Sequence, residues 1–241
     1  MRYSVIIPAH NEGAHIEGQV SRFITNLPSE VSEFLQEVII VENGSTDDSL
    51  AVCRQLEQRF PHLVRTCTLA RGSYGEAIKL GMLESNGTHL SILECDFLDA
   101  AFVAKSIQMF RSSDVALIVG SKRHPQSRDL RPFKRRALTA IYNLIALRMF
   151  TGYPGTDTHG LKSLKTDCAR KLCEAAITTD EVLQTEIVLL AWKMGLKIEE
   201  IPVSIHELRA APVTIFRRVP KVLRTVQDLR RSLRRFAPQG Q

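Results

Sequence analysis

The sequence predicts an α/β fold, built as a mainly parallel central sheet flanked by helices, with a basic amphipathic helix at its C-terminal end. Short apolar runs such as Val38–Val41 alternate with amphipathic segments of about ten to fifteen residues, which is typical of βαβ units. These runs are continuous rather than alternating, as expected of strands covered on both faces. The chain of 241 residues, 44% of them hydrophobic, is long enough for one well-packed domain.

Each expected element follows from a local pattern. Pro8 closes the first strand, and Pro132 suits the first turn of a long helix, where no amide donor is needed. Asp47 or Asp48 can cap the helix that runs to Phe60. We expect strands at 2–8, 38–41, 63–69, 89–96, 115–121 and 197–205. We expect helices at 12–25, 48–60, 74–85, 100–111, 132–149, 165–176, 181–194 and 213–236, and a loop at 151–160.

Composition and patterning exclude several classes of protein. No stretch approaches the roughly 18 apolar residues of a membrane span, and the N-terminus lacks the pattern of a signal peptide. Five cysteines form no CxxC pair, which indicates reduced thiols in a cytoplasmic protein. The sequence leaves open whether the protein forms a homo-oligomer.

The net charge of +6 is concentrated in two segments. Seven basic residues lie between Lys122 and Arg136, and nine lie between Arg209 and Arg235. Such clusters suit phosphates or an anionic membrane surface, although solvated helix faces carry similar runs. Few aromatic residues are interleaved with them, so we expect no nucleic-acid partner. We divide the chain into a main domain, 1–212, and a basic amphipathic helix and tail, 213–241.

Two acids end the apolar run of the fourth expected strand. Glu94 and Asp96 are two positions apart, and in an extended chain such residues point to the same side. Both carboxylates can then face one Mg²⁺ or Mn²⁺ ion, which takes oxygen ligands and shares them with substrate phosphates. A solvated acidic loop is the alternative interpretation of this pair.

Three strand ends carry acids, amides and small residues. They read Pro8-Ala9-His10-Asn11-Glu12, Glu42-Asn43-Gly44-Ser45 and Glu94-Cys95-Asp96. The carboxyl ends of parallel strands open onto one edge of a sheet, so these residues are expected to converge on one crevice. Arg71, after the third strand, can add a cation. Such a lining predicts a nucleotide site.

In order, the motifs SVIIPAHNE, VENGSTDDS, ECDFLDA, VGSKR, GTDTHGLK and TEIVLLAWKMG resemble those of the family 2 inverting glycosyltransferases. Within that family the sequence is most similar to dolichol-phosphate mannose synthases and other polyprenyl-phosphate glycosyltransferases. The resemblance implies the nucleotide-sugar-binding GT-A fold and a divalent metal. It also implies transfer of a hexose, mannose or glucose, from GDP-mannose or a UDP-hexose to a polyprenyl phosphate, by an enzyme peripheral at the inner face of a membrane.

The resemblance also implies roles for single residues. Asp96 matches the second acid of the family's metal-binding DxD motif, with Glu94 in place of the first, and Leu98 stands where the synthases have a metal-binding glutamine. His10 stands where a tyrosine is usual. The full set of donor-binding candidates is Pro8, Ala9, Asn11, Glu12, Glu42, Asn43, Gly44, Ser45, Arg71, Gly75, Glu94 and Cys95.

The acceptor phosphate is implied to bind a second set of residues, which comprises Lys122, Arg135, Thr139, Asp157 and His159. A lipid phosphate is already anionic, so transfer needs no general base, and catalysis can depend on Asp96, Lys122 and Arg135 through positioning and charge stabilisation. Two alternatives remain at this stage. A hydroxyl acceptor would require a base such as Asp157, Asp180 or Glu181, and a non-catalytic lipid- or nucleotide-binding relative would require none.

Overall fold

The computed structural model describes residues 1–130, 136–137, 151–205, 229 and 232–233. Among these residues seven strands form one sheet in the order β3-β2-β1-β4-β7-β5-β8, and β6 and β9 form a small second sheet. The strands of the main sheet are β1 Tyr3–Ala9, β2 Leu35–Asn43, β3 Val64–Leu69, β4 His89–Ile92, β5 Leu117–Ser121, β7 Lys162–Lys165 and β8 Ile198–Pro202. The two short strands are β6 Arg128–Asp129 and β9 Ser204–Ile205.

All neighbouring pairs in the main sheet are parallel except those of β7, which is antiparallel to both β4 and β5. The prediction of a mainly parallel sheet is therefore confirmed. Strand β7 was not expected, because Lys162-Ser-Leu-Lys165 lies between a glycine-rich loop and a helix and has a lysine at each end. The register pairs Ala9 with Glu42, so the carboxyl ends of β1 and β2 lie side by side.

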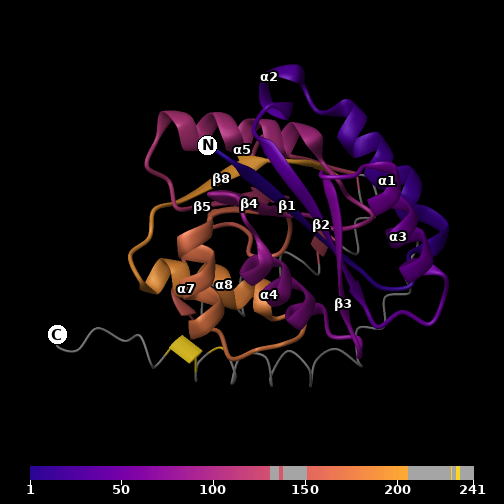
Figure 1. The fold of residues 1–241 in the computed structure, drawn as a ribbon. Helices are drawn as coiled ribbons and strands as arrows, with labels where there is room; N and C mark the ends of the chain where they lie inside the picture. The colour runs from indigo at the N-terminus through magenta and orange to yellow at the C-terminus, as the bar shows by residue number, and fades with distance from the viewer. Residues whose placement is uncertain (131–135, 138–150, 206–228, 230–231, 234–241) are drawn as a thin grey trace.

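Helices cover both faces of the sheet (Figure 1). On one face lie α1 Gly13–Asn26, α3 Ser49–Arg59 and α5 Ala100–Ser112, and on the other lie α4 Tyr74–Glu84, α7 Thr166–Ala175 and α8 Leu183–Lys193. A short helix, α2 Ser29–Ser32, precedes β2. Residues of β2 alternate between the two cores: Val38 and Ile40 pack in the first, and Ile39 and Val41 in the second. This alternation explains the continuous apolar run, because both faces of the strand are buried.

A chain of buried hydroxyl groups crosses the middle of the sheet. The Tyr3 hydroxyl lies 2.9 Å from Ser91 Oγ, which lies 2.6 Å from Ser163 Oγ, and Ser163 donates to Ser106 Oγ of α5 over 3.0 Å. Burial raises the pKa of Tyr3 to about 12, so the phenol stays protonated. The network satisfies the polar groups that β7 brings into the core.

The structure corrects two expected boundaries. Strand β4 ends at Ile92, not Asp96, because the backbone turns tightly afterwards, with the Phe97 amide donating to the Glu94 carbonyl over 2.8 Å. The expected strand at 197–205 is divided into β8 and β9. The expected helix at 132–149 and most of the one at 213–236 lie outside the described residues, as does the proposed boundary at 212.

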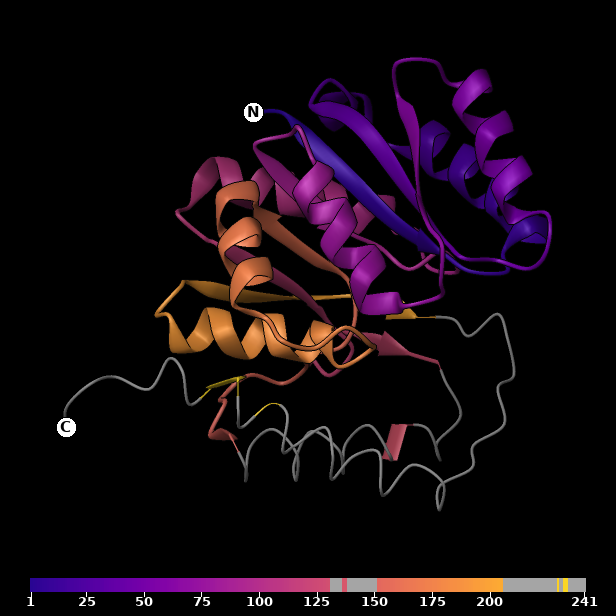
Figure 2. The ribbon, with the colours of Figure 1, turned by 60° about the horizontal axis from the view of Figure 1, so that its bottom comes forward.

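Three residues of the expected C-terminal helix are described, Leu229, Ser232 and Leu233, and all three are buried. Leu229 and Leu233 are buried in the core that contains α4, α7 and α8. At these two positions the expected amphipathic helix packs its apolar side against the domain. Figure 2, with the lower side of the molecule turned forward, shows α4, α7 and α8 side by side on this face of the sheet. No helix among the described residues has the length and apolar content needed to span a membrane.

Candidate active site at the carboxyl ends of the strands

A cavity of about 600 Å³ lies where the ends of β2, β4 and β5 meet the N-terminal parts of α4 and α8. Its polar lining brings together residues from across the whole sequence. The lining residues are His10, Asn43, Gly72, Tyr74, Glu94, Asp96, Lys122, His159, Gly160, Glu181 and Gln184. This position, at the carboxyl edge of a parallel sheet, is where α/β proteins bind ligands.

The acidic turn supplies two carboxylates to the cavity. Asp96 is exposed at the tip of the turn, whereas Glu94 is half-buried at its start. Our argument from an extended strand was wrong, because residues 94–97 form a turn; both carboxylates nevertheless line the same cavity. Tyr74 donates to Glu94 Oε1 over 2.5 Å, and the Gln184 side-chain amide donates to the same oxygen over 2.7 Å.

Side-chain hydrogen bonds shape the loop that follows β2. Buried Glu42 accepts from the Ser45 amide over 2.6 Å, and Asn43 accepts from the Ser73 amide over 2.7 Å. His10 Nδ1 lies 2.8 Å from the Asn43 carbonyl oxygen, which places the imidazole at the cavity. Glu42 therefore fixes the turn of its own loop, whereas Asn43 joins the loops that follow β1 and β3 and also reaches the cavity.

Two glycines permit a close approach of these loops. Gly44 has φ +62°, and a Cβ there would lie 2.7 Å from the Gly72 nitrogen. A Cβ on Gly75 would lie 2.4 Å from the Thr179 carbonyl carbon, and the Gly75 amide donates to the Thr179 oxygen over 2.9 Å. Both positions require glycine, which has no side chain to clash. These two glycines contribute to the site by letting neighbouring backbone segments approach each other closely.

Lys122 is fixed in position by Asp157. The Lys122 amide donates to Asp157 Oδ2 over 3.1 Å, and the His159 amide donates to Oδ1 over 3.0 Å. Asp157 is fully buried, and burial raises the pKa of its carboxyl group above the ordinary value, against the opposing effect of Lys122. Asp157 thus joins the turn that carries Lys122 to the loop that carries His159, and both of those side chains line the cavity.

His159 is enclosed by protein at the cavity wall. Its Nδ1 lies 3.2 Å from Thr185 Oγ1 of α8. Burial, with Lys162 and Lys122 nearby, lowers the pKa of His159 to about 3. The imidazole is therefore neutral at physiological pH, which suits hydrogen bonding to a phosphate better than charge pairing.

We expect His159 to make the stability of the protein depend on pH. Its pKa is about 3 in the folded protein against 6.5 for the free side chain, so between these values the unfolded chain binds more protons. The stability is fully present above pH 6.5 and is lost as the pH falls. The difference in unfolding free energy between wild type and His159→Gln should change by about 1.4 kcal/mol per pH unit between pH 6 and 4. Urea unfolding at several pH values measures this difference. The control is His15→Gln, on the exposed side of α1. If the unfolding free energies of wild type and His159→Gln changed with pH in parallel, this expectation would be contradicted.

The predicted site residues fall into three groups. Asn43, Glu94, Asp96, Lys122 and His159 line the cavity. Others lie around it, at strand ends, in loops or at the start of α4, without lining it, namely Pro8, Ala9, Asn11, Glu12, Glu42, Gly44, Ser45, Arg71, Gly75, Cys95 and Asp157. Of these, Cys95 is buried in the core beside α1 and α5. Arg135 and Thr139 lie outside the described residues.

The acids of the cavity are compatible with a divalent ion. Within the described part of the chain, no group of three or more acidic, histidine or cysteine side chains is gathered for a metal. Mg²⁺ and Mn²⁺ do not need such a cage, because one or two carboxylates commonly hold them together with substrate phosphates. Asp96, with the second oxygen of Glu94, fits this kind of partial coordination.

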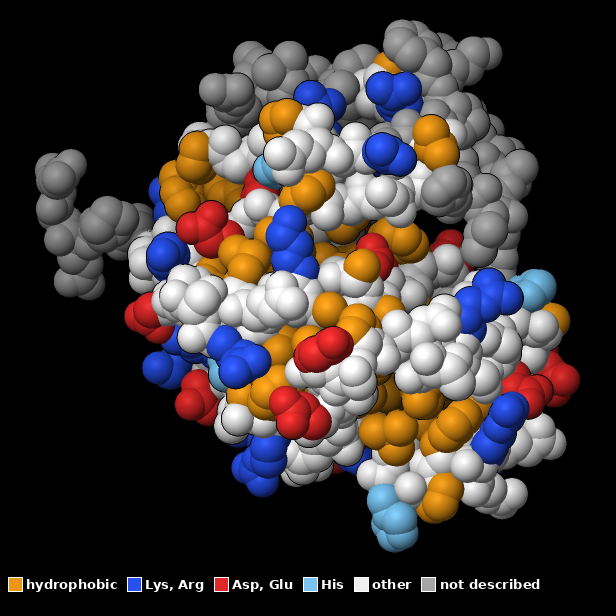
Figure 3. Space-filling view, turned by 90° about the horizontal axis from the view of Figure 1, so that it is seen from above, with side chains coloured by type: hydrophobic (Ala, Val, Ile, Leu, Met, Phe, Trp, Pro, Cys, Tyr) orange, Lys and Arg blue, Asp and Glu red, His pale blue; other side chains and the backbone are white. Residues whose placement is uncertain are grey.

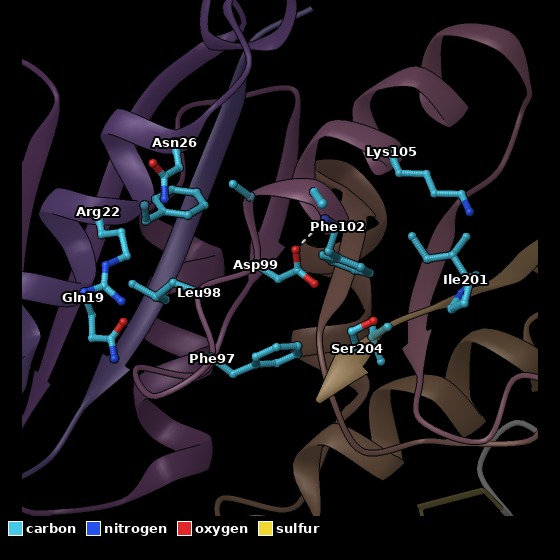
Figure 4. Close-up of a pocket in the computed structure, with 15 residues that line it drawn as sticks. Gln19, Arg22, Asn26, Phe97, Leu98, Asp99, Phe102, Lys105, Ile201 and Ser204 are labelled. Atoms are coloured by element: carbon cyan, nitrogen blue, oxygen red, sulfur yellow. Dashed lines mark hydrogen bonds between the residues drawn. The ribbon is translucent and has the colours of Figure 1, made fainter. Parts of the chain in front are cut away.

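A second cavity, also about 600 Å³, lies between α1, α5 and β8 (Figure 4). It is lined by aromatic and aliphatic residues such as Phe97, Phe102 and Ile201. Asp99 lies in this cavity, and its side chain accepts from the Phe102 amide over 3.0 Å, which caps α5. Leu98 and Asp99 are thus directed away from the acidic cavity. Hydrophobic side chains also gather in hollows of the surface seen from above (Figure 3).

Sequence reasoning missed three polar residues around the site. Tyr74 and Gln184 bind Glu94, and Lys162 donates to Gln184. Glu186, to which no role could be assigned from the sequence, accepts from the amides of Ile177 and Thr178. Nothing local marks these residues, since their partners lie up to 110 positions away in the chain.

A parallel α/β sheet with acids, amides and a lysine gathered over a cavity at its carboxyl edge is the arrangement of α/β enzymes that bind their ligands at the strand ends. Comparison with known proteins identifies the family. The model of glycosyl transferase family 2 matches residues 4–172, and the chain belongs to this family. It is a glycosyltransferase, as the motifs predicted.

Curated relatives match most of the chain at low identity. A dolichyl-phosphate beta-glucosyltransferase of Trichomonas vaginalis is 23% identical over 229 residues, which cover 88% of this chain and 68% of the relative. The enzyme of the same name from Dictyostelium discoideum is 24% identical, with coverage of 88% and 69%.

Solved structures show the same fold. A glucosyl-3-phosphoglycerate synthase from Mycobacterium tuberculosis, in complex with Mn²⁺, UDP and glucosyl-3-phosphoglycerate, superimposes with a TM-score of 0.67 at 18% identity, covering 100% of this chain and 81% of the other. The UDP complex of that enzyme gives a TM-score of 0.70 at 17% identity, with coverage of 95% and 79%. The predicted α/β fold with a mainly parallel sheet flanked by helices is thereby confirmed, whereas the C-terminal basic helix stays a prediction.

Proposed function

We propose that the protein transfers glucose, with inversion, from UDP-glucose to a polyprenyl phosphate, and that Mg²⁺ or Mn²⁺ assists the transfer. The single observation that carries this proposal is the presence of Asp96 and Lys122 on one cavity. Asp96, which can bind a metal at the donor diphosphate, and Lys122, which can pair with an anionic acceptor, thus line the same cavity. The relatives named as dolichyl-phosphate beta-glucosyltransferases favour glucose over mannose and a lipid phosphate over other acceptors.

The donor half of the cavity would hold the nucleotide. Asn43 and His10 line it beside the ends of β1 and β2, where base and ribose can hydrogen bond. Asp96 and Glu94 would hold the divalent ion on the diphosphate; when bound, that ion supplies Lewis-acid stabilisation of the leaving group. A neighbouring structure contains Mn²⁺, UDP-glucose and phosphoglyceric acid, which supports a UDP donor by analogy of fold.

The acceptor half would hold a phosphate that is already ionised. Lys122 would pair with it, while Asp157 fixes the backbone of that lysine. Neutral His159 can donate a hydrogen bond to a phosphate oxygen. Because such a nucleophile needs no proton removed, the residues of the cavity contribute by orientation and charge. Arg135 and Thr139, outside the described residues, remain predicted partners of the same phosphate.

Transfer of [¹⁴C]glucose distinguishes the acceptors. UDP-[¹⁴C]glucose, Mn²⁺ and polyprenyl phosphate in vesicles should give an organic-soluble, acid-labile product, whereas polyprenol lacking the phosphate should give none. GDP-[¹⁴C]mannose in parallel tests the sugar. Label transferred equally to polyprenol, or only to water-soluble acceptors, would contradict the proposed reaction.

One observation favours a hydroxyl acceptor as a second candidate. Glu181 lines the cavity and can serve as the base that a hydroxyl nucleophile requires. If this candidate is correct, Glu181→Gln should lower transfer to phosphoglycerate or a sugar by about 10²-fold or more. If the lipid phosphate is the acceptor, the same substitution should change the rate only a few-fold.

We further propose that the enzyme works at an anionic membrane surface. Arg123, Arg128 and Arg136 are exposed, and Leu130 beside them is 63% exposed. Near an anionic leaflet each cation contributes about 1 kcal/mol. Sedimentation with phosphatidylserine vesicles at physiological salt should carry the protein into the pellet. Recovery of all the protein in the supernatant would exclude this association.

A further inference from the structure

A network of buried hydrogen bonds lies behind the acidic turn at residues 94–97. Lys162 of β7 is fully buried, and its Nζ donates to Gln184 Oε1 over 2.5 Å and to the Gly160 carbonyl over 2.9 Å. The Nε2 of Gln184 donates to Glu94 Oε1 over 2.7 Å and also to the Tyr74 hydroxyl. Four elements, β7, α8, α4 and the turn after β4, therefore meet around the carboxylate of Glu94.

The chemistry of the two ends fixes the orientation of the Gln184 amide. A lysine amine donates hydrogen bonds here, and a carboxylate only accepts them, so the amide must direct its oxygen to Lys162 and its nitrogen to Glu94. The Gly160 amide also donates to Gln184 Oε1, over 3.3 Å, so Lys162 supplies the shorter of the two hydrogen bonds that hold this oxygen. Without Lys162 the amide is held less firmly, and a rotated amide would place an oxygen against the carboxylate. Lys162 thus acts on the orientation of the Glu94 carboxylate through Gln184, which hydrogen bonds to both residues.

The orientation of the Glu94 side chain determines where its second carboxylate oxygen, Oε2, lies. Both hydrogen bonds from Tyr74 and Gln184 end on Oε1, and no hydrogen bond between described residues ends on Oε2. The longer side chain of glutamate, compared with aspartate, reaches this pair while Oε2 remains available at the cavity.

The same hydrogen-bond network extends to the part of the cavity that is proposed to bind the acceptor. Gly160, which accepts from Lys162, lies in the loop with Asp157 and His159 and itself lines the cavity. We propose that Lys162 and Gln184 are positioning residues, which hold Glu94 in the orientation in which its carboxylate would face the divalent ion on the nucleotide diphosphate, and which also fix the position of loop 157–160 relative to Glu94. This inference rests on the proposed function, because it concerns how the same cavity binds its donor.

Equilibrium binding of UDP in the presence of Mn²⁺, measured by calorimetry, tests the proposal without turnover. Lys162→Met removes the donor and keeps a similar length, and it should weaken UDP binding about tenfold. Lys165→Met is the matched control. It lies on the same strand, and its side chain is one-third exposed and paired with Asp114 at the surface, so it should bind UDP like the wild type.

A double-mutant cycle shows whether the effect passes through Glu94. In a Glu94→Ala background, Lys162→Met should weaken UDP binding no further, because its target is gone. Gln184→Met provides a second variant, with the same expectations, should Lys162→Met fail to give a cooperative unfolding transition.

The outcomes separate this inference from the proposed function. Variants that bind UDP as tightly as the wild type, or a tenfold loss that persists in the Glu94→Ala background, would overturn the positioning role. Wild-type protein that binds no UDP would instead contradict the proposed donor itself, and the inference would fall with it.

Discussion

An Asp96→Asn protein is expected to transfer sugar about 10²–10³-fold more slowly than the wild type, because one negative oxygen is replaced by an amide that cannot hold a divalent ion beside the diphosphate. Asp96 is the exposed acid at the tip of the turn, so the substitution leaves no buried group unsatisfied. The loss should therefore appear in initial rates and in Mn²⁺-dependent binding of UDP, with the unfolding free energy nearly unchanged.

Asp99→Asn is the matched control for this substitution. It changes the same residue type three positions later, where the side chain caps α5 in the other cavity. We expect it to leave stability nearly unchanged, because asparagine caps a helix about as well as aspartate, and to leave the transfer rate within about twofold. Equal loss of transfer in the two variants would show that the acidic turn acts through folding rather than through its charge.

A Glu186→Ala protein is expected to be less stable by about 3–5 kcal/mol. Glu186 is fully buried and accepts from the amides of Ile177 and Thr178, over 3.0 and 2.8 Å, and from the Thr178 hydroxyl. Removing the carboxylate leaves these half-buried donors without this acceptor, and hydrogen bonds to a charged group contribute about 1.5–3 kcal/mol each. Urea unfolding followed by circular dichroism measures the change.

The effect should extend to the site, because the loop that Glu186 holds continues to Thr179. The Thr179 carbonyl accepts from the Gly75 amide at the start of α4 and from the Ser73 hydroxyl. Glu186→Gln keeps the volume and one acceptor oxygen, and we expect it to lose about half as much stability as the alanine variant. A loss below about 1 kcal/mol in Glu186→Ala would contradict this structural role.

The sequence predicted those parts of the fold that depend on local patterns. Apolar runs located β1, β2 and β3 to within a few residues, because burial on both faces requires continuous hydrophobic character. Strand β7 escaped prediction because its stability is not local. Lys162 is buried there by partners on α8 and in a loop, and a strand with a lysine at each end has no apolar pattern.

The sequence predicted those residues of the candidate site that lie at the end of an expected strand. Asn43, Glu94 and Asp96 follow apolar runs directly, and the parallel sheet brings those ends to one edge. Tyr74 and Gln184 could not be predicted, because a helix-terminal tyrosine and a glutamine 110 residues away become neighbours only in the folded chain. The turn at Glu94–Phe97 was also missed, since an acid pair does not reveal whether its backbone is extended.

The position of the metal tests the central claim most directly. Crystals grown with UDP and Mn²⁺ would locate the ion by its anomalous scattering, without reliance on activity. The account predicts a peak at coordination distance from the Asp96 carboxylate, in the cavity that Lys122 also lines. A peak on Asp99 in the other cavity, or none at Asp96 while UDP is bound, would contradict it.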